Sequence, residues 1–374
     1  MSLFLISCGG TGGHLSPGIS LAEGLTARGH DCRLLISQKK VDARLSEKYP
    51  KLHFERMPGS GLSFHPVRLG KFVLSQAHAL LFCLRLLRQA RPDAIVGFGG
   101  FTSAPLVLAA WVLDVPAVLH ECNRVPGRAI RMLGRFATRV YLPPGIRISS
   151  IRASATRHAG LPVRREIRRS PPASARAALG LDPNRRTLVL LGGSQGASSL
   201  NDWMRANLDV FAAEGIQVYC VTGLGKGREG VVGLKTRAGE PIQAIFTPFS
   251  DRMAELMSAA DLVISRAGAG TLAELIRCET PAILVPYPRA ADDHQRANAE
   301  YFERQGGGVV VRQQRVGGMA AEVLDIIFND WLLRRFRSNL QRMDRANSLD
   351  LMLGDIEQIA RCQRSDSCRE PVTA

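Results

Sequence analysis

The sequence predicts an α/β protein with two doubly wound domains, each a parallel sheet covered by helices on both faces. Short apolar runs end in glycine turns and lead into helical spacing, and the whole pattern restarts near residue 187. The 374 residues also exceed the usual size of a single hydrophobic core. We therefore expect a first domain over residues 1–163, joined by a C-terminal helix at 345–365, and a second domain over 164–344.

The first domain begins with an expected strand over Leu3–Ser7, which runs into the glycine turn Gly9–Gly13. After this turn, from Pro17 onward, apolar residues recur at helical spacing, so the segment predicts a strand, a turn and a helix. A second glycine turn, Gly97–Phe101, follows an apolar run at 94–96. Further strands are expected at residues 32–36 and 116–120.

The second domain repeats this design. An expected strand over 187–191 runs into the glycine turn Gly192–Ala197, and a helix follows. Later strands are expected at residues 218–221, 244–246, 262–264 and 282–285. Helices are expected after residue 311, over the basic segment 331–345 and over 349–362. The segment 164–183, interrupted by Pro171 and Pro172, is the expected linker, because proline does not continue a helix.

The composition is strongly basic, with 49 Lys+Arg against 33 Asp+Glu and a net charge of +16. Such an excess is either solvated or faces an anionic lipid or substrate, and both interpretations stay open. Aromatic residues make up only 6% and the arginines are scattered, so no nucleic acid is expected as a partner. The eight cysteines lack metal-binding spacing and indicate reduced, cytosolic thiols.

Membrane contact, by this sequence, is expected to be peripheral. Gln76, His78 and Arg85 interrupt the longest apolar stretch, and we expect no segment long and apolar enough to cross a bilayer. The helix expected over 71–90 is apolar on more than one side, which is typical of a core helix. Because basic residues bracket it, an apolar patch on anionic lipid is the alternative.

Glycine turns between a strand and a helix bring backbone N–H groups close to an anion, where the helix dipole stabilises phosphate. The first turn lacks the dinucleotide spacing G-x-G-x-x-G, and no acidic residue ends the second strand, so NAD binding is disfavoured. His14 lies just beyond this turn and is the best candidate for a general base. The alternative is a histidine that hydrogen-bonds locally at the start of a helix.

The segment 261–274 ends a strand with a cation, turns on glycines and opens a helix. Arg266 and the free N–H groups after it suit a diphosphate. Glu274 suits the two ribose hydroxyls, or it simply complements the helix dipole. Glu121 and Asn123 end another strand, where they bind sugar hydroxyls or satisfy backbone groups in a tight turn.

Asp292, Asp293 and His294 precede a helix that carries Gln295 and Asn298, where ligands bind in open sheets. A metal site is disfavoured, because adjacent residues seldom aim at one ion. No metal and no cofactor are therefore expected.

Taken together, six motifs resemble the MurG family of glycosyltransferases in order and spacing. They are Gly9–His14, Gly97–Phe101, His120–Asn123, Gly192–Ala197, Arg266–Glu274 and Gln295-x-x-Asn298. The resemblance covers residues 3–311 and implies the GT-B architecture, in which two Rossmann-like domains face each other across a cleft. It implies transfer of N-acetylglucosamine from UDP-GlcNAc to the C4 hydroxyl of the muramoyl sugar of undecaprenyl-diphosphate-linked lipid I. The reaction inverts the anomeric carbon and forms lipid II for peptidoglycan synthesis.

The resemblance also implies roles for individual residues. His14 would be the base. The UDP-sugar would contact Thr11, Gly12, Gly13, Asn123, Arg164, Ser194, Gln195, Arg266, Ala269, Gly270, Thr271, Glu274 and Gln295. The acceptor diphosphate would meet Gly9, Gly10, Gly99 and Gly100. The implied location is the cytoplasmic face of the bacterial inner membrane, with an anionic membrane surface as a peripheral partner.

Two positions depart from the family pattern: Cys122 stands where Gln is usual and Ala267 where Ser is common. Both are expected beside donor-site residues, so they bear on donor contacts. Two rival functions remain open on this fold, a UDP-GlcNAc 2-epimerase and a non-catalytic subunit that binds a nucleotide sugar.

Overall fold

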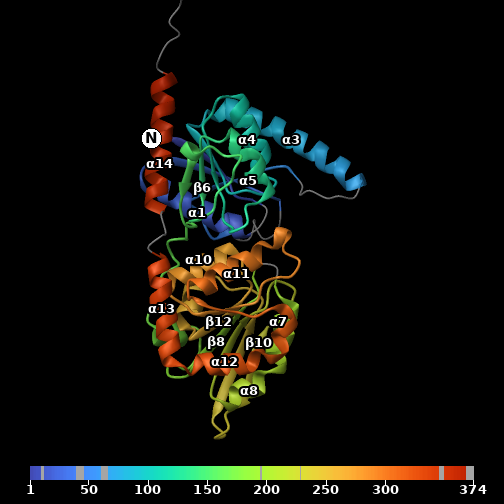
Figure 1. The fold of residues 1–374 in the computed structure, drawn as a ribbon, viewed down its shortest axis with the longest axis vertical. Coiled ribbons are helices and arrows are strands. Elements are labelled where there is room, and N and C mark those ends of the chain that lie inside the picture. The colour runs from blue at the N-terminus through green and yellow to red at the C-terminus, as the bar shows by residue number, and fades with distance from the viewer. Residues whose placement is uncertain are drawn as a thin grey trace, which may run out of the picture. The chain divides into compact units, whose positions relative to one another are not determined.

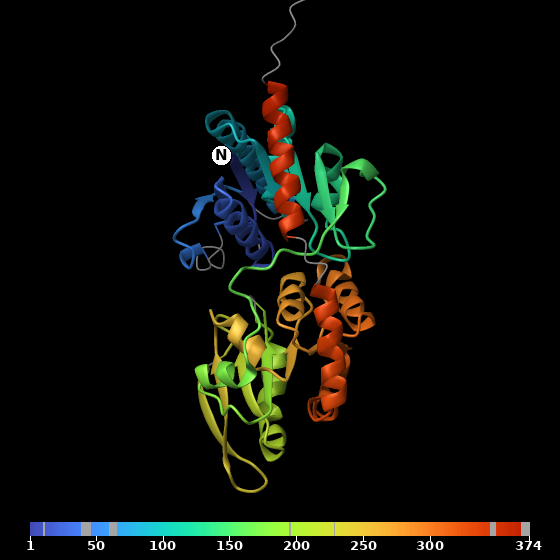
Figure 2. The same ribbon diagram turned by 90° about the vertical axis from the view of Figure 1, so that its left-hand side faces the viewer.

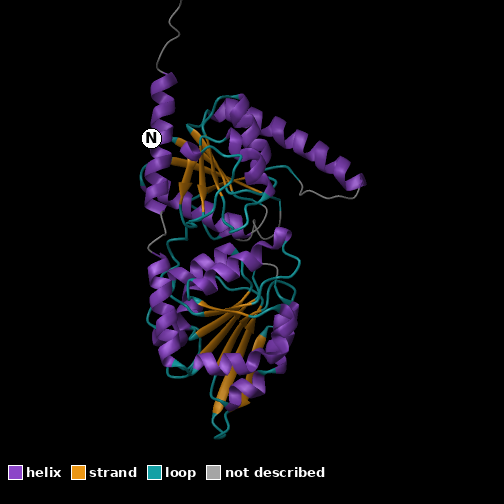
Figure 3. Ribbon diagram, viewed as in Figure 1, coloured by secondary structure: helices purple, strands orange, loops and turns teal. Residues whose placement is uncertain are grey.

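The computed structural model describes residues 1–374 except 10–11, 39–45, 60–65, 194–195, 228, 345–348 and 368–374, and it omits the side chains at 12, 66–69 and 364–367. The chain divides into two compact units. The first unit comprises Met1–Arg164 and Asn347–Ala374, and the second comprises Arg165–Ala346. In each unit the strands lie between layers of helices (Figure 3), so the expected α/β fold with two doubly wound domains is confirmed.

The first unit contains a sheet of seven strands in the order β3-β2-β1-β4-β5-β6-β7. Every neighbouring pair is parallel. The strands are β1 (Leu3–Ser7), β2 (Asp31–Ile36), β3 (His53–Arg56), β4 (Ala94–Gly97), β5 (Ala117–His120), β6 (Arg139–Leu142) and β7 (Thr156–His158). The central strands β1, β4 and β5 are almost wholly buried, as the near-continuous apolar runs of a covered parallel sheet require.

The helices of the first unit include the long α3, which Figure 1 shows extending beyond the sheet past α4. They are α1 (Gly12–Ala27), α3 (Pro66–Ala90), α4 (Ser103–Val112), α5 (Arg128–Leu133) and α14 (Leu349–Ser367). Two short 3-10 helices, η1 (Gly134–Phe136) and η2 (Ala153–Ala155), complete the unit.

The last helix of the chain, α14, belongs to the first unit and lies along it (Figure 2). Met352, Leu353 and Ile356 join the same buried cluster as Phe4 and Leu15. A Cβ atom at Gly24 of α1 would lie only 2.8 Å from Leu353 Cδ1, so glycine permits the close approach of the two helices. The chain therefore returns to complete the core that its N-terminal residues begin.

The second unit contains a sheet in the order β10-β11-β9-β8-β12-β13-β14. The pair β10–β11 is antiparallel, and the other neighbours are parallel. The strands are β8 (Thr187–Leu191), β9 (Gln217–Val221), β10 (Gly230–Lys235), β11 (Pro241–Thr247), β12 (Leu262–Ser265), β13 (Ala282–Leu284) and β14 (Gly308–Val310). The covering helices are α6 (Pro172–Ala178), α7 (Ser198–Ala206), α8 (Leu208–Ala213), α9 (Met253–Ala259), α10 (Ala269–Arg277), α11 (His294–Arg304), α12 (Met319–Ile327) and α13 (Asp330–Asp344), with the 3-10 helices η3 (Ala291–Asp293) and η4 (Gln313–Gly318).

The segment expected to be a linker is largely part of the second unit. Pro172 does not interrupt a helix here but begins α6, where its fixed φ and missing N–H suit the first helical turn. Arg176 of this helix is buried and donates to Asp261 Oδ2 at 2.8 Å and to the Ala259 carbonyl at 2.9 Å. The linker interpretation was therefore wrong for these residues.

Candidate active site

The first unit has a topological switch point between β1 and β4. From this pair the chain proceeds through β2 and β3 on one side and through β5, β6 and β7 on the other. In open α/β sheets, ligands bind outside the carboxyl ends of the strands at such a point. Both predicted glycine turns of this unit follow these two strands: Gly9 comes after β1, and Gly99 and Gly100 come after β4.

The backbone at these turns favours glycine for two different reasons. A Cβ atom at Gly9 would lie 2.3 Å from the Ser37 nitrogen at the end of β2, so the turn after β1 is pressed against the neighbouring strand. Gly99 and Gly100 have φ values of +91° and +75°, which L side chains rarely adopt. Gly10 and Thr11 lie outside the described residues. The sequence thus uses glycine where the two turns approach each other.

His14 lies in the first turns of α1, whose first helical residues are Gly12 and Gly13, and its ring packs over the turn after β4. A Cβ atom at Gly100 would lie 3.4 Å from His14 Nδ1, and one at Gly99 would lie 3.8 Å from Nε2. The imidazole is half-buried. The structure therefore brings His14, Gly99 and Gly100 together at the switch point, which is where a base for an incoming substrate would have to be.

The turn after β5 is closed by Glu121. Its Oε1 accepts from the Asn123 backbone N–H at 2.8 Å and side-chain amide at 3.3 Å, and its Oε2 accepts from the Gly127 N–H at 2.7 Å. Burial raises the pKa of Glu121, although these hydrogen bonds oppose the change. These contacts support the second interpretation of Glu121, in which its carboxylate accepts hydrogen bonds from backbone N–H groups of the turn. The same carboxylate holds Asn123 in place.

Cys122 and His120 form a second contact at this strand end. Burial lowers the pKa of His120 to about 4, so its ring is neutral at pH 7. Its Nε2 lies 3.2 Å from the Gly160 carbonyl and donates to it, which leaves Nδ1 to accept from the Cys122 thiol at 3.7 Å. The pKa of Cys122 is raised by burial, so the thiol keeps its proton. Cys122, which stands where the family usually has Gln, therefore hydrogen-bonds to His120.

The buried imidazole of His120 predicts acid sensitivity of the first unit. The unfolded chain binds this proton near pH 6.5 and the folded one only near pH 4, so stability falls as pH drops between these values. The expected loss from this group is about 3 kcal/mol by pH 4. The raised pKa of Glu121 has the opposite effect on the pH dependence of stability. Glu121 is present in both the wild type and the variant compared below, so its effect is common to both.

Urea unfolding from pH 7 to pH 4 compares the protein with a His120→Gln variant. The free-energy advantage of the wild type should shrink steadily as the pH falls. An advantage that does not change with pH would show that His120 does not titrate as its burial requires.

Arg164 is the last residue of the continuous part of the first unit and is buried. Its Nη1 donates to the Tyr49 hydroxyl at 3.1 Å. The preceding residue is also fixed, because Ser20 Oγ of α1 donates to the Val163 carbonyl at 2.8 Å. The helix that carries His14 is thus bonded to the segment that leads to Arg164.

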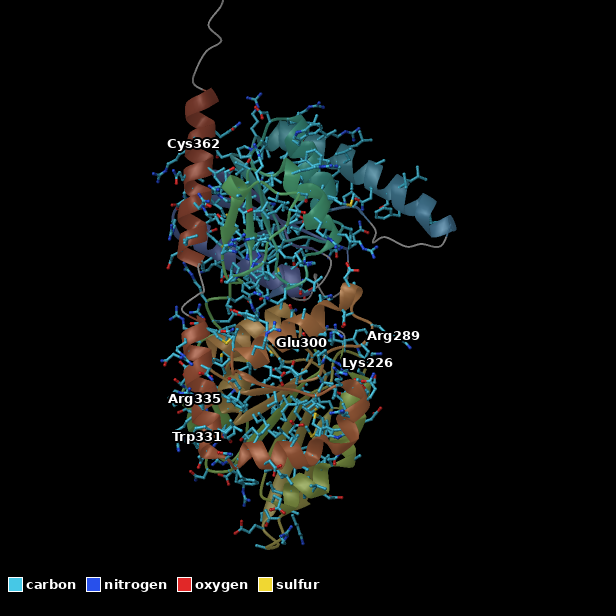
Figure 4. All side chains as sticks on the ribbon, viewed as in Figure 1. Lys226, Arg289, Glu300, Trp331, Arg335 and Cys362 are labelled. Atoms are coloured by element: carbon cyan, nitrogen blue, oxygen red, sulfur yellow. The ribbon has the colours of Figure 1, made fainter. Side chains whose placement is uncertain are left out.

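The second unit has its own switch point, between β8 and β12. The glycine turn after β8 includes Gly193 and Gly196, with φ values of +76° and +69°. Ser194 and Gln195 lie outside the described residues. A Cβ atom at Gly196 would lie 2.6 Å from the Thr222 carbonyl oxygen and 2.7 Å from Lys226 Cγ, so the side-chain stem of Lys226 covers this turn. Lys226 is exposed and is labelled in Figure 4, and it was not predicted although it is a cation in the loop between β9 and β10.

The segment after β12 forms the other side of this switch point. Gly268 precedes α10 in an extended conformation, and α10 opens with Ala269, Gly270 and Thr271. The N-cap residue is Gly268, which has no side chain to cap these first N–H groups, and such groups suit an anion at the positive end of the helix. Glu274 follows on the same helix and is 8% exposed.

Arg266 is bonded to protein groups at this edge. Its Nη1 donates to the Val285 carbonyl at 3.0 Å, and its Nη2 donates to Ser199 Oγ at 3.2 Å. Its guanidinium also lies 5.7 Å from the centre of the Tyr287 ring, and burial lowers its pKa. The arginine therefore connects the turns after β8, β12 and β13 and shapes the site that they form.

Gln295 and Asn298 on α11 bond to neighbouring turns. Gln295 Oε1 accepts from the Tyr287 N–H at 2.9 Å, and Asn298 Nδ2 donates to the carbonyl of the buried Ala267 at 3.2 Å. Asp292 and Asp293 both have positive φ, near 50°. Across the described ranges, no three His, Cys, Asp or Glu side chains are grouped as metal ligands would be.

The comparisons agree with this arrangement of two units. The glycosyltransferase family 28 N-terminal domain model matches residues 4–142, and the family 28 C-terminal domain model matches residues 187–346. Among solved structures, the crystal structure of Acinetobacter baumannii MurG has a TM-score of 0.69 at 22% identity, covering 95% of this chain and 99% of that chain. CalG4, the calicheamicin glycosyltransferase, has a TM-score of 0.67 at 15% identity, covering 96% and 98%. At these identities the likeness shows the GT-B fold.

Sequence relatives cover the whole chain. A protein of Opitutus terrae is 63% identical over 374 residues, which is 100% of this chain and 99% of that protein. A protein of Parasynechococcus marenigrum is 38% identical over 84% of each chain. Both are named as UDP-N-acetylglucosamine--N-acetylmuramyl-(pentapeptide) pyrophosphoryl-undecaprenol N-acetylglucosamine transferase. The chain therefore belongs to the MurG family of glycosyltransferases, within glycosyltransferase family 28.

Proposed function

We propose that this protein transfers N-acetylglucosamine from UDP-GlcNAc to the C4 hydroxyl of the muramoyl sugar of lipid I and so forms lipid II. The observation that carries the proposal is the end-to-end match to the Opitutus terrae transferase, whose name gives the donor, the transferred sugar and the lipid-linked acceptor. The geometry supports it, because each unit presents two turns that follow the strands of its switch point. Such turns suit diphosphates, which both substrates contain.

In the proposed mechanism, the donor binds mainly to the second unit. Its diphosphate lies at the first N–H groups of α10, at Ala269–Thr271, with Glu274 on the ribose. The family resemblance assigns further UDP-sugar contacts to Gln295 and the turn after β8 in the second unit and to Asn123 and Arg164 in the first. It assigns the acceptor diphosphate to Gly9, Gly10, Gly99 and Gly100 in the first unit. The acceptor oxygen attacks the anomeric carbon, the bond from that carbon to the diphosphate breaks, and UDP leaves with the bonding electrons. His14 takes the proton of the acceptor hydroxyl, and the anomeric configuration inverts.

A labelled-substrate assay tests this function. Purified protein receives radiolabelled UDP-GlcNAc with or without a lipid I analogue. Label should move to the lipid only when the analogue is present. Epimer formation from UDP-GlcNAc alone would instead support the epimerase alternative, and binding without either product would support the non-catalytic one.

The membrane association that we propose is carried by α3. Its segment Gly70–Ala90 is long and apolar enough to cross a bilayer by length and composition alone, so our expectation that no segment reaches this limit was wrong. Only 22% of the apolar window is buried.

The exposure of α3 favours contact along its surface. Val73, Leu74 and Leu81 are 58%, 73% and 55% exposed, while Cys83 and Leu87 pack into the unit. The exposed cations are Lys71, Arg85, Arg88 and Arg91. An exposed apolar face with basic neighbours suits an anionic lipid surface. We therefore propose a peripheral enzyme at the cytoplasmic face of the bacterial inner membrane.

Vesicle sedimentation checks this proposal. A Leu74→Glu/Leu81→Glu double variant should bind vesicles containing phosphatidylglycerol on the order of 10-fold more weakly, because apolar burial is lost and like charge is added. Turnover of a water-soluble acceptor should not change. Val231→Glu alters an equally exposed apolar residue of the second unit and serves as the control. Equal vesicle binding by all three proteins would exclude α3 as the contact.

A further inference from the structure

Thr102 occupies the position just before α4 and is completely buried. Threonine at this position commonly accepts a hydrogen bond from its own helix. The Thr102 side chain makes no such bond. Its Oγ1 instead donates to the Gly9 carbonyl at 3.1 Å, in the turn after β1 and 93 residues away. The hydroxyl therefore joins two turns rather than capping its helix.

Both ends of this bond are tightly restrained. Gly9 is confined on its other side by Ser37, because a Cβ atom added at Gly9 would lie only 2.3 Å from the Ser37 nitrogen. The turn after β4 is closed by Ser103, whose Oγ donates to the Gly99 carbonyl at 2.7 Å and accepts from the Gly99 N–H at 3.1 Å. Thr102 thus fixes one restrained turn to another.

Gly100 lies beside both His14 and the Gly9 carbonyl that Thr102 holds. A Cβ atom added at Gly100 would lie 3.4 Å from His14 Nδ1 and 3.5 Å from the Gly9 oxygen to which Thr102 donates. A movement of the Gly9 carbonyl therefore changes the position of the turn on which the imidazole packs. A displacement of about 1 Å at a reacting group can cost on the order of 100-fold in rate.

We propose that Thr102 is a positioning residue for glycosyl transfer: its hydroxyl holds the Gly9 carbonyl and so keeps the two glycine turns, and His14 against the turn after β4, in the reactive arrangement. The inference rests on the proposed function and on His14 as its base. It assigns to Thr102 a role mainly in turnover, because the proposed diphosphate and ribose contacts of the UDP-sugar lie in the second unit.

The test is steady-state kinetics of Thr102→Val, which keeps the side-chain shape and removes the hydroxyl. We expect kcat to fall about 10-fold while KM for UDP-GlcNAc changes less than about 2-fold, because the proposed diphosphate and ribose contacts of the donor lie in the second unit and are not displaced. Thr102→Ser keeps a hydroxyl and should restore most of kcat. Thr102→Ala removes the hydroxyl without the valine methyl group and serves if Thr102→Val does not fold.

Thr280→Val is the matched control. Thr280 is also buried, and its Oγ1 donates to the Met257 carbonyl at 2.8 Å in the second unit. Its loss should lower thermal stability as Thr102→Val does, but leave kcat unchanged. In a His14→Ala background, Thr102→Val should lower the residual rate less than 2-fold, since residues that act together are not additive.

The outcomes separate the two proposals. Absence of lipid-linked product from the wild type overturns the proposed function itself. An active wild type with equal kcat in Thr102→Val overturns only the positioning role. A fall in kcat that Thr102→Ser does not restore, or that Thr280→Val matches, assigns Thr102 to stability alone and also overturns the inference.

Discussion

Replacing His14 by alanine should lower kcat by a factor on the order of 100 to 10,000, the range that general bases usually contribute. The imidazole packs on Gly99 and Gly100 at the switch point of the first unit, where the proposed acceptor diphosphate lies. Affinity for UDP should not change, because the proposed UDP contacts lie mainly elsewhere. Turnover with a lipid I analogue and calorimetric titration with UDP measure the two quantities.

His30→Ala provides the control for this experiment. His30 lies in the same unit, but it bonds to the Ser2 N–H at 3.2 Å and to Glu357 at 3.1 Å, so its loss should lower stability without lowering kcat. Unchanged turnover in His14→Ala would remove the base assignment while leaving the transferase function intact. Lost UDP binding would instead indicate a structural role for the ring.

Replacing Asp355 by leucine should destabilise the first unit by about 3 kcal/mol, because the buried Tyr141 hydroxyl and the half-buried Arg139 guanidinium lose their acceptor. Arg139 donates to both Asp355 oxygens at 2.8 and 3.1 Å, and the Tyr141 hydroxyl donates to Oδ2 at 2.7 Å. These bonds tie α14 to β6. Urea unfolding followed by circular dichroism should show an earlier transition for the first unit.

Asp350→Leu is the matched change on the same helix. Asp350 pairs with Arg28 at 3.0 Å, but its side chain is 95% exposed, so the loss should be below about 1 kcal/mol. Similar losses for Asp350→Leu and Asp355→Leu would show that the buried network around Asp355 does not hold α14 in place.

Much of the fold could be predicted because its central strands are apolar runs. β1, β8 and β12 are covered on both faces, so the apolar composition of these segments is enough to predict them as strands. β3 and β7 were not predicted, because they are short strands at the sheet edges and three or four mostly polar residues carry no such signal. The error at Pro172 has a similar cause: proline that stops one helix also starts another.

At the site, the sequence predicted the glycine turns but not their attachments. The positive φ of Gly99 and Gly100 follows from their residue type and place after a strand. The bond from Thr102 to Gly9 spans 93 residues, and nothing in the local pattern of either segment indicates it. Which residues contact the substrates stays a prediction until a complex with donor or acceptor is measured.

The discontinuity of the first unit affects how the chain matures. Its buried cluster draws Phe4 and Leu15 from one end of the polypeptide and Met352 and Ile356 from the other. During synthesis from the N-terminus, the whole second unit leaves the ribosome before α14 is available. The unit that carries His14 therefore acquires its final core only once α14 has been made, which is later than the synthesis of the whole second unit.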